Sequence, residues 1–207
     1  MNIGILGTGR MGTGLARGWV KVGHEVTFGS RDPSLNRAAA EQIGAGIGGY
    51  ADALHNAEAV VIGVPYGAVR DVIAPLRDLL KEKIVIDITN PMDNLPPEGS
   101  GAQATAAAIG PGARVIPAFK ATFHGTLGEP IDPATGMARD VFFCGDDSKA
   151  KGVVASLIED LGFRAVDCGP LSRANLLDLM VPLIIEVDGR YNMGRSGSWK
   201  LLGQPTG

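Results

Sequence analysis

The sequence predicts an α/β fold, a doubly wound and mainly parallel Rossmann-type sheet with a short C-terminal strand–helix extension. Three observations lead to this prediction. The apolar runs are short and rich in Val and Ile, they alternate with stretches typical of helices, and Gly and Pro fall between the two as turn residues. Continuously apolar runs suit strands that helices cover on both faces. Strands that alternate with helices predict βαβ units and a parallel sheet.

The alternation gives each expected element in order along the chain. The expected strands occupy residues 3–6, 25–28, 46–48, 59–64, 83–88, 114–118, 141–144 and 164–167, of which 46–48 is weak. The expected helices occupy residues 10–22, 34–42, 66–80, 103–109, 149–161 and 173–187. The remaining long stretch, 119–140, has no such pattern, and a loop of that length in a compact domain is usually functional or mobile.

The composition argues against several classes of protein. A chain of 207 residues suits one domain or one domain with a small appendage. A net charge of -3 without a basic run gives no footprint for nucleic acid, and no apolar stretch approaches the roughly 20 residues that span a bilayer. The N-terminus shows no signal peptide, and two cysteines form no disulfide framework. We therefore expect a cytoplasmic protein that binds neither nucleic acid nor membrane.

The strongest motif is a glycine-rich turn between the first strand and the first helix. It consists of Gly7, Thr8, Gly9, Arg10, Met11 and Gly12. A Gly-x-Gly-x-x-Gly run between a strand and a helix indicates a dinucleotide site. Gly7 permits the tight turn, Gly9 lets the backbone approach the pyrophosphate, and Gly12 lets the helix pack close to the strand. The helix N-terminus supplies N–H donors, so a glycine-rich turn without a ligand is the weaker interpretation.

The end of the second strand indicates NADP(H) rather than NAD(H). An NAD site usually has a carboxylate there, about 20 residues beyond the glycines, for the ribose 2′-OH. This chain has Ser30 and Arg31 instead, and Arg can bind a 2′-phosphate with two charge-assisted hydrogen bonds. Arg37 is a candidate for a second cation. Alternatively, Ser30 and Asp32 only cap the next helix, which explains the serine but not Arg31.

The ends of the next two strands should line the rest of the groove, because cofactors lie across the carboxyl ends of the strands in such sheets. Val64 and Pro65 end one strand, and Pro65 offers an apolar wall. Asn90 ends the other and can hydrogen-bond a ribose or the nicotinamide carboxamide. Asn90 followed by Pro91 is equally typical of a turn.

Lys120 and His124 are the best polar candidates on the acceptor side, after the sixth strand. Each could bind the second substrate or serve as its acid or base, and each could instead be a solvated surface residue. Neither belongs to a recognisable catalytic pair, so no catalytic residue is assigned. Cys144 and Cys168 stand alone at strand ends as packing residues, and no cluster has metal-ligand spacing.

Several pieces together make the chain resemble the NADP oxidoreductases that use the deazaflavin coenzyme F-420 (also written F420), over nearly its whole length. Besides the glycine motif they are Gly29-Ser30-Arg31 and the segments at 143–147, 168–172, 182–184, 192–194 and 200–202. The resemblance implies direct hydride transfer between NADPH and a deazaflavin stacked face to face. Such a transfer depends mainly on positioning, which fits the missing catalytic pair.

One segment departs from the archetypal members of that family. Residues 118–124 are more similar to branches that also resemble the NADPH domain of membrane ferric reductases. The departure concerns the second substrate, so a flavin is the next acceptor to consider. An NADPH-dependent reductase of a small carbonyl or imine compound is an alternative, although its relatives usually carry a long helical C-terminal domain. A non-catalytic NADP-sensing protein is the other alternative.

The C-terminal part carries the expectations about assembly. We divide the chain into an NADP-binding Rossmann domain, residues 1–140, and an extension, 141–207, that completes the sheet, the acceptor pocket and a dimer interface. Residues 176–185 are apolar apart from Asp178, and such a helix should be buried on more than one face. Pro182 should kink the helix or divide it in two. Met193 and Gly194 then lie where the tail can close the acceptor pocket, and we expect a homodimer.

Overall fold

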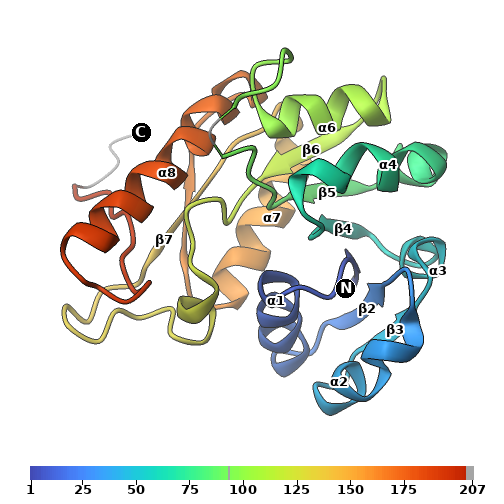
Figure 1. The fold of residues 1–207 in the computed structure, drawn as a ribbon, viewed down its shortest axis with the longest axis horizontal. Coiled ribbons are helices and arrows are strands. Elements are labelled where there is room, and N and C mark those ends of the chain that lie inside the picture. The colour runs from blue at the N-terminus through green and yellow to red at the C-terminus, as the bar shows by residue number, and fades with distance from the viewer. Residues whose placement is uncertain (93, 204–207) are drawn as a thin grey trace.

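The computed structural model describes residues 1–92 and 94–203, and its centre is a six-stranded parallel sheet (Figure 1). The strands lie in the order β3-β2-β1-β4-β5-β6, so the chain runs outward from β1 in both directions. Their bounds are β1 Asn2–Leu6, β2 Glu25–Gly29, β3 Gly46–Gly48, β4 Ala59–Ile62, β5 Ile84–Asp87 and β6 Arg114–Pro117. The predicted doubly wound α/β fold is confirmed, including the weak third strand.

Helices cover both faces of this sheet. The α-helices are α1 Arg10–Lys21, α2 Arg37–Gln42, α3 Tyr50–Leu54, α4 Val69–Ile73, α5 Arg77–Leu80, α6 Gly101–Ile109, α7 Ser148–Asp160 and α8 Ala174–Arg190. The short 3-10 helices are η1 Pro33–Asn36, η2 Tyr66–Ala68, η3 Ala74–Leu76, η4 His124–Gly128 and η5 Leu171–Arg173. Buried side chains of α1, α2 and α7 pack on one face. Those of α3 to α6 and the start of α8 pack on the other.

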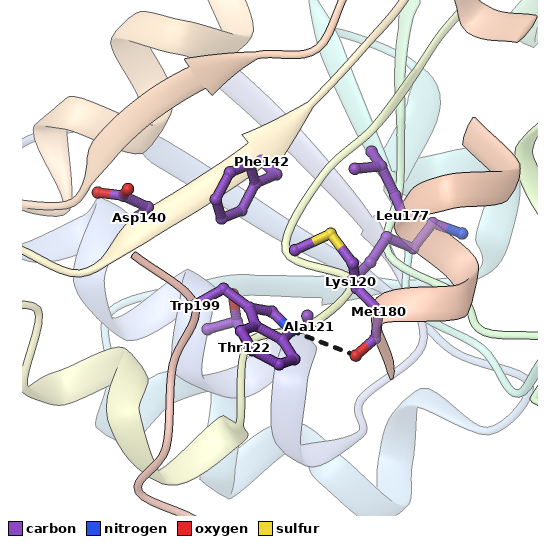
Figure 2. Close-up of a pocket in the computed structure, with 8 residues that line it drawn as sticks. All are labelled: Lys120, Ala121, Thr122, Asp140, Phe142, Leu177, Met180 and Trp199. Atoms are coloured by element: carbon purple, nitrogen blue, oxygen red, sulfur yellow. Dashed lines mark hydrogen bonds between the residues drawn. The ribbon is translucent and has the colours of Figure 1, made fainter. Parts of the chain in front are cut away.

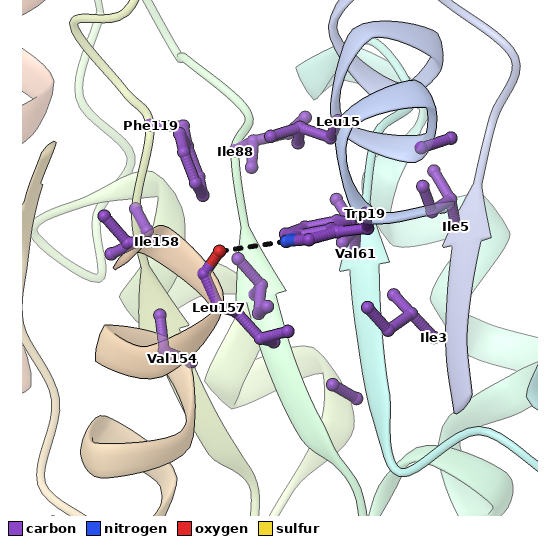
Figure 3. Packing of buried hydrophobic residues seen from close by; sticks show 14 of the residues in the cluster. Ile3, Ile5, Leu15, Trp19, Val61, Ile88, Phe119, Val154, Leu157 and Ile158 are labelled. Atoms are coloured by element: carbon purple, nitrogen blue, oxygen red, sulfur yellow. Dashed lines mark hydrogen bonds between the residues drawn. The ribbon is translucent and has the colours of Figure 1, made fainter. Parts of the chain in front are cut away.

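The first of these cores is organised around Trp19 (Figure 3). Its indole N–H donates to the carbonyl of Leu157 over 2.9 Å, which ties α1 to α7. Phe119 lies edge-on between Trp19 and Phe163, with ring centroids 6.4 Å and 6.3 Å away. Phe119 has a φ of 55°, so the chain turns sharply where β6 ends, and the buried ring fixes that turn.

The C-terminal strands differ from the prediction that the extension completes the main sheet. β7 (Asp140–Phe143) and β8 (Arg164–Asp167) pair with each other in a separate two-stranded parallel sheet. Val141 and Phe143 of β7 instead join the main sheet through side chains, in the buried cluster that contains Ile116 of β6. The described strands β6 and β7 are therefore in contact through side chains and not through a hydrogen-bonded ladder.

Several helical regions also differ in detail, and the expected helix at 34–42 is divided into η1 and α2. The expected helix at 66–80 is divided into η2, α4, η3 and α5, and Pro75, which has no N–H to donate, stands at the start of η3. Helix α3 was not predicted; it begins where the Asp52 carboxylate accepts the Gly49 N–H over 2.8 Å. Helix α8 is continuous through Pro182, so the proline does not divide it. No helix in the described part of the chain is long and apolar enough to cross a membrane.

Candidate active site

The glycine-rich turn holds the N-terminus of α1 open toward a groove. Gly9 is the N-cap of α1, no side chain caps the helix, and no acidic residue lies in its first turn. The first N–H groups of α1 are therefore available to an anion. A Cβ on Gly9 would meet no protein atom closer than 3.8 Å, whereas one on Gly7, with a φ of +109°, would lie 2.7 Å from the Gly63 carbonyl oxygen. Gly7 therefore shapes the turn and Gly9 leaves space for a ligand.

The third glycine of the motif sets the distance between helix and strand. A Cβ on Gly12 would lie 3.0 Å from Cγ2 of Ile5. Any side chain there would push α1 away from β1 and tilt its N-terminus. The space around the three glycines is therefore compatible with the three roles that the motif predicts.

One end of the groove is a cavity beside the C-terminal end of β2. It is lined by the glycine turn and by Gly63–Pro65, Ser30, Arg31, Asp32, Leu35, Asn36 and Tyr50. Arg31 is exposed and forms no ion pair with any described residue. Its guanidinium is the free cation that a 2′-phosphate requires. Arg37 is the first residue of α2, is exposed, and does not line this cavity.

The capping alternative holds for Asp32 alone. Its Oδ1 accepts from the Ser34 N–H over 3.1 Å, which caps η1, and this bonding to Ser34 lowers the pKa of the carboxyl. Ser30 Oγ instead donates to the Asp32 carbonyl over 3.0 Å. Arg31 takes no part in the cap, so capping does not explain it. Tyr50 is a lining residue that the sequence reasoning missed, because it begins the helix that was not predicted.

The other end of the groove is a second cavity beside the ends of β4 and β5. It is lined by Gly9, Arg10, Met11, Gly63, Pro65, Asn90, Met92, residues 120–124, Val181, Ile184, Ile185 and Arg195. Gly9, Gly63 and Pro65 line both cavities, so the two meet at the glycine turn. Val64 faces only the first cavity. The turn thus stands between a cation-bearing cavity and one with apolar walls from α8.

Asn90 presents an unused hydrogen-bonding atom at the second cavity. Its Nδ2 donates to the Lys120 carbonyl over 3.4 Å. Its Oδ1 is buried and has no partner in the described part of the chain. A buried acceptor without a partner costs free energy, so a ligand that donates to it is favoured. The cofactor interpretation of Asn90 therefore has a structural basis that a turn residue alone would lack.

Lys120 is not the solvated loop lysine that was one interpretation of the sequence. Only 2% of its side chain is exposed, and its Nζ lies 2.9 Å from Asp178 Oδ1 and 3.6 Å from Asp87 Oδ1. Nζ also donates to the Thr89 carbonyl. The ammonium therefore faces buried carboxylates rather than a substrate, although Lys120 is among the residues that line the cavity.

Hydrogen bonds hold the two acids in place. Asp178 Oδ2 accepts from the Gly101 N–H over 2.8 Å, at the N-terminus of α6, where the helix dipole favours an anion. Asp87 accepts from the Thr89 backbone N–H over 2.8 Å and from the Thr105 hydroxyl over 2.6 Å. The buried charges therefore join β5, α6, the end of β6 and α8 at the cavity. Asp87 and Asp178 were not among the predicted site residues.

The C-terminal tail reaches the cavity through Arg195 rather than through the predicted Met193 and Gly194, which do not line it. The Arg195 guanidinium lies 5.4 Å from the centroid of the Phe123 ring, a cation–π contact. His124, the remaining predicted residue, is exposed at the start of η4 and lines the cavity. Within one chain, the tail therefore supplies a wall of its own cavity.

Two buried acids fix the tail in this position. Asp188 accepts from the Arg195 N–H over 2.9 Å and from the Gly197 N–H over 3.1 Å. Asp140 of β7 accepts from Lys200 Nζ over 2.7 Å and from the Leu201 N–H over 2.8 Å. Figure 2 shows the small cavity between β7, α8 and the tail, where the Trp199 indole N–H donates to the Met180 carbonyl over 3.3 Å.

The two cysteines are unsuited to nucleophilic chemistry. Cys144 is fully buried, and burial raises the pKa of its thiol to about 12. Burial also raises the pKa of the Cys168 thiol. Both stay protonated near neutral pH, which agrees with packing roles.

Comparison with known proteins shows the family to which the chain belongs. Residues 2–91 match the family described as NADP oxidoreductase coenzyme F420-dependent. The F420-dependent NADP reductase of Methanothermobacter thermautotrophicus is 31% identical over 219 residues, which cover 95% of this chain and 93% of that protein. The crystal structure of a proposed F420-dependent NADP-reductase from Arthrobacter sp. FB24 has a TM-score of 0.82, 29% identity, and coverage of 93% of this chain and 95% of that one.

A second group of relatives consists of metalloreductases. The metalloreductase STEAP3 of Rattus norvegicus is 29% identical over 183 residues, which are 87% of this chain but 36% of that protein. The similarity to the F420-dependent reductases covers nearly the whole of both proteins, whereas the similarity to the metalloreductase covers one part of it.

Proposed function

The chain belongs to the family of coenzyme F420-dependent NADP oxidoreductases, and we propose that its groove binds NADP(H) and that its second cavity binds the deazaflavin that exchanges hydride with it. The observation that carries the proposal is the meeting of the two cavities at Gly9, Gly63 and Pro65. A dinucleotide whose pyrophosphate lies on the glycine turn reaches both cavities, one with each end. Its 2′-phosphate end then lies beside Arg31, and its nicotinamide end beside Asn90.

The residues present fit such a cofactor. The position of Gly9 leaves the approach to the α1 N-terminus open. Arg31 offers a cation, and Asn90 Oδ1 an acceptor, that no residue within 1–92 and 94–203 pairs with. In the reaction, NADPH gives up one hydride and becomes NADP⁺, while the acceptor takes up that hydride and one proton from water. Transfer of this kind needs alignment and exclusion of water more than acid–base catalysis.

The walls of the second cavity supply that alignment. Val181, Ile184 and Ile185 present apolar side chains from α8, which suit a planar ring and exclude water from it. Pro65 continues the apolar surface toward the glycine turn. The fixed position of Lys120, held by Asp178, keeps α8 against this cavity. No side chain here has to act as an acid or base on the hydride path.

Mixing the protein with NADPH and coenzyme F-420 tests this proposal. Reduction removes the absorbance of the oxidised deazaflavin, so its loss at a rate that depends on protein concentration supports the proposal. NADH at the same concentration is the control for cofactor choice, and flavins are the control for acceptor choice. Reduction of a flavin but not of the deazaflavin would overturn the assignment of the acceptor. Oxidation of NADPH by a small imine or ketone alone would support the alternative reductase.

We also propose that the protein forms a homodimer through the outer face of α8. Leu176, Leu179 and Leu183 are 51%, 50% and 53% exposed, and they follow one face of the helix at i, i+3 and i+7. A continuous row of exposed leucines on a helix is typical of an interface. A cytoplasmic location remains a prediction from the sequence.

A further inference from the structure

A second groove runs along the outer side of α1. It lies next to the second cavity, where we place the hydride acceptor and which we call the acceptor cavity from here on. Its walls are one face of α1, the η4 turn, which lies beside α1 in Figure 1, and the end of α7. The lining residues are Thr8, Arg10, Thr13, Gly14, Arg17, Gly18, Lys21, Val22, His124, Leu127, Gly128, Pro130, Asp160, Leu161 and Gly162. The cofactor site described above uses only the first turn of α1, so the rest of this groove has no role there.

Two glycines of α1 form the floor of the groove. A Cβ on Gly14 would lie 2.6 Å from Cδ1 of Leu127, and one on Gly18 would lie 2.4 Å from Cδ2 of Leu161. The absence of side chains at these positions lets η4 and the end of α7 approach the helix closely. The groove is therefore built by packing and is not only a space between mobile side chains.

The groove is positively charged on a chain whose net charge is -3. Arg10, Arg17 and Lys21 lie along its α1 wall, and all three are exposed. None forms an ion pair with another described residue. The one carboxylate in the lining, Asp160, is already engaged, because its Oδ2 lies 3.0 Å from His24 Nε2. Unpaired cations in a built groove attract an anion.

The cations extend well beyond the phosphate loop. At a rise of 1.5 Å per residue, Arg17 lies about 10 Å and Lys21 about 16 Å along the helix from Arg10. The N–H groups that bind a pyrophosphate are confined to the first turn. Arg17 and Lys21 are therefore too far away to serve the pyrophosphate of the dinucleotide. A row of this length suits an extended chain that carries several anionic groups.

The groove opens into the acceptor cavity, since Arg10 and His124 line both. We propose that Arg10, Arg17 and Lys21 bind an anionic chain, phosphate and carboxylate in character, that is attached to the hydride acceptor. The ring of the acceptor then lies in the apolar cavity against α8, and its chain follows α1 outward. This inference rests on the proposed function for the ring, but Arg17 and Lys21 line only this groove and neither cavity of the hydride-transfer site.

The test compares two acceptors that share one ring. One is coenzyme F-420, whose deazaflavin bears a chain with phosphate and glutamate groups, and the other is the same deazaflavin with only its uncharged ribityl chain. The variant Arg17→Gln/Lys21→Gln should raise KM for the charged acceptor by roughly three- to thirtyfold, as expected for two exposed charge contacts. KM for the uncharged acceptor should change much less, and kcat should hardly change. Added salt should raise KM for the charged acceptor more in the wild-type protein than in the variant.

The matched control is Lys149→Gln/Arg173→Gln. It removes two exposed cations that lie outside the groove, and so changes the net charge equally. If the control raises KM as much as the groove variant does, the effect is general electrostatic attraction and the inference is wrong. An equal change of KM for both acceptors in the groove variant also overturns it.

Equilibrium binding separates this inference from the proposed function. If NADPH reduces neither deazaflavin, hydride transfer to this ring is refuted, and the intrinsic fluorescence of each deazaflavin still reports its binding. Tighter binding of the charged form that is lost in Arg17→Gln/Lys21→Gln then upholds the groove. Binding that is the same for both forms, or the same in both proteins, refutes it.

Discussion

Replacing Gly9 by Val should abolish nucleotide binding while the protein stays folded. The φ of Gly9 is -72°, which any residue adopts, and a Cβ there would meet no protein atom within 3.8 Å. The cost to folding is then mainly the poorer N-cap, about 1 kcal/mol, or a fall in Tm of roughly 2–4 °C for a chain of this size. The side chain would project into the space of the pyrophosphate. Losing two N–H bonds to a charged group costs roughly 3–6 kcal/mol, which is more than about a hundredfold in affinity.

Gly7→Ala should instead lower the stability of the fold. The φ of +109° is strained for any L residue, and the Cβ would lie 2.7 Å from the Gly63 carbonyl oxygen. Strain of about 1–3 kcal/mol and this contact should both lower the stability of the fold. The two glycines are thus distinguished by which measurement each one changes.

Calorimetric titration with NADPH and thermal unfolding followed by circular dichroism make the comparison. Gly152→Val is the matched control, because Gly152 is exposed in α7 and a Cβ there would meet nothing within 4 Å. It should bind NADPH like the wild type. Tight NADPH binding by a folded Gly9→Val protein would refute the position of the groove.

Three further predictions follow from the same structure. Arg31→Ala should weaken NADPH binding roughly ten- to a hundredfold and NADH binding very little. The control Arg37→Ala, outside the cavity lining, should change neither affinity by more than about twofold. Equal weakening of both nucleotides by Arg31→Ala would contradict the 2′-phosphate assignment. Burial alone would raise the pKa of Asp140, but hydrogen bonds from Arg164, Lys200 and a backbone N–H outweigh burial and lower that pKa below 3.8. The stabilisation of the fold by ionised Asp140 is therefore complete above about pH 4 and is lost as the pH falls through the lowered pKa. Asp140→Asn should lower the free energy of unfolding at pH 7 by about 1.5–3 kcal/mol and flatten its decline in acid, and a decline as steep as that of the wild type would contradict this. Leu179→Glu on the outer face of α8 should convert a dimer to a monomer in light scattering, and a monomeric wild-type protein would rule out the dimer.

The parts of the site that lie close together in the sequence could be predicted from it. The glycine turn, its strand and its helix occupy one continuous stretch, so spacing alone gives the role of each glycine. The interpretation of Arg31 was likewise local, since it depends on the missing carboxylate at the end of one strand. The parallel, doubly wound sheet followed from the alternation of strands with helices, and the structure confirms it.

The buried charges at the acceptor cavity could not be predicted in the same way. Lys120 and Asp178 are 58 positions apart, and their contact depends on how α8 packs against the end of β6. A signal was present, because Asp178 is the only polar residue in an otherwise apolar stretch and must find a partner if buried. The sequence does not say which of the 19 Lys and Arg residues is that partner. The sequence analysis placed Met193 and Gly194 at the cavity, where the structure has Arg195, since the course of the tail depends on bonds to Asp188.

Helix α8 links the shape of the acceptor cavity to the buried charges beneath the cofactor groove. Its inner face carries Asp178, which pairs with Lys120, and Val181 and Ile184, one and two turns further on, line the cavity. Removing one member of a buried ion pair leaves the other charge uncompensated, so the helix would have to shift to bring in water. Such a shift would move the apolar wall away from the nicotinamide end without touching Arg31 or the glycine turn. Under the proposed function, we therefore expect Arg31 and the glycine turn to set the affinity for NADPH, and Lys120 to act mainly on the alignment of the acceptor.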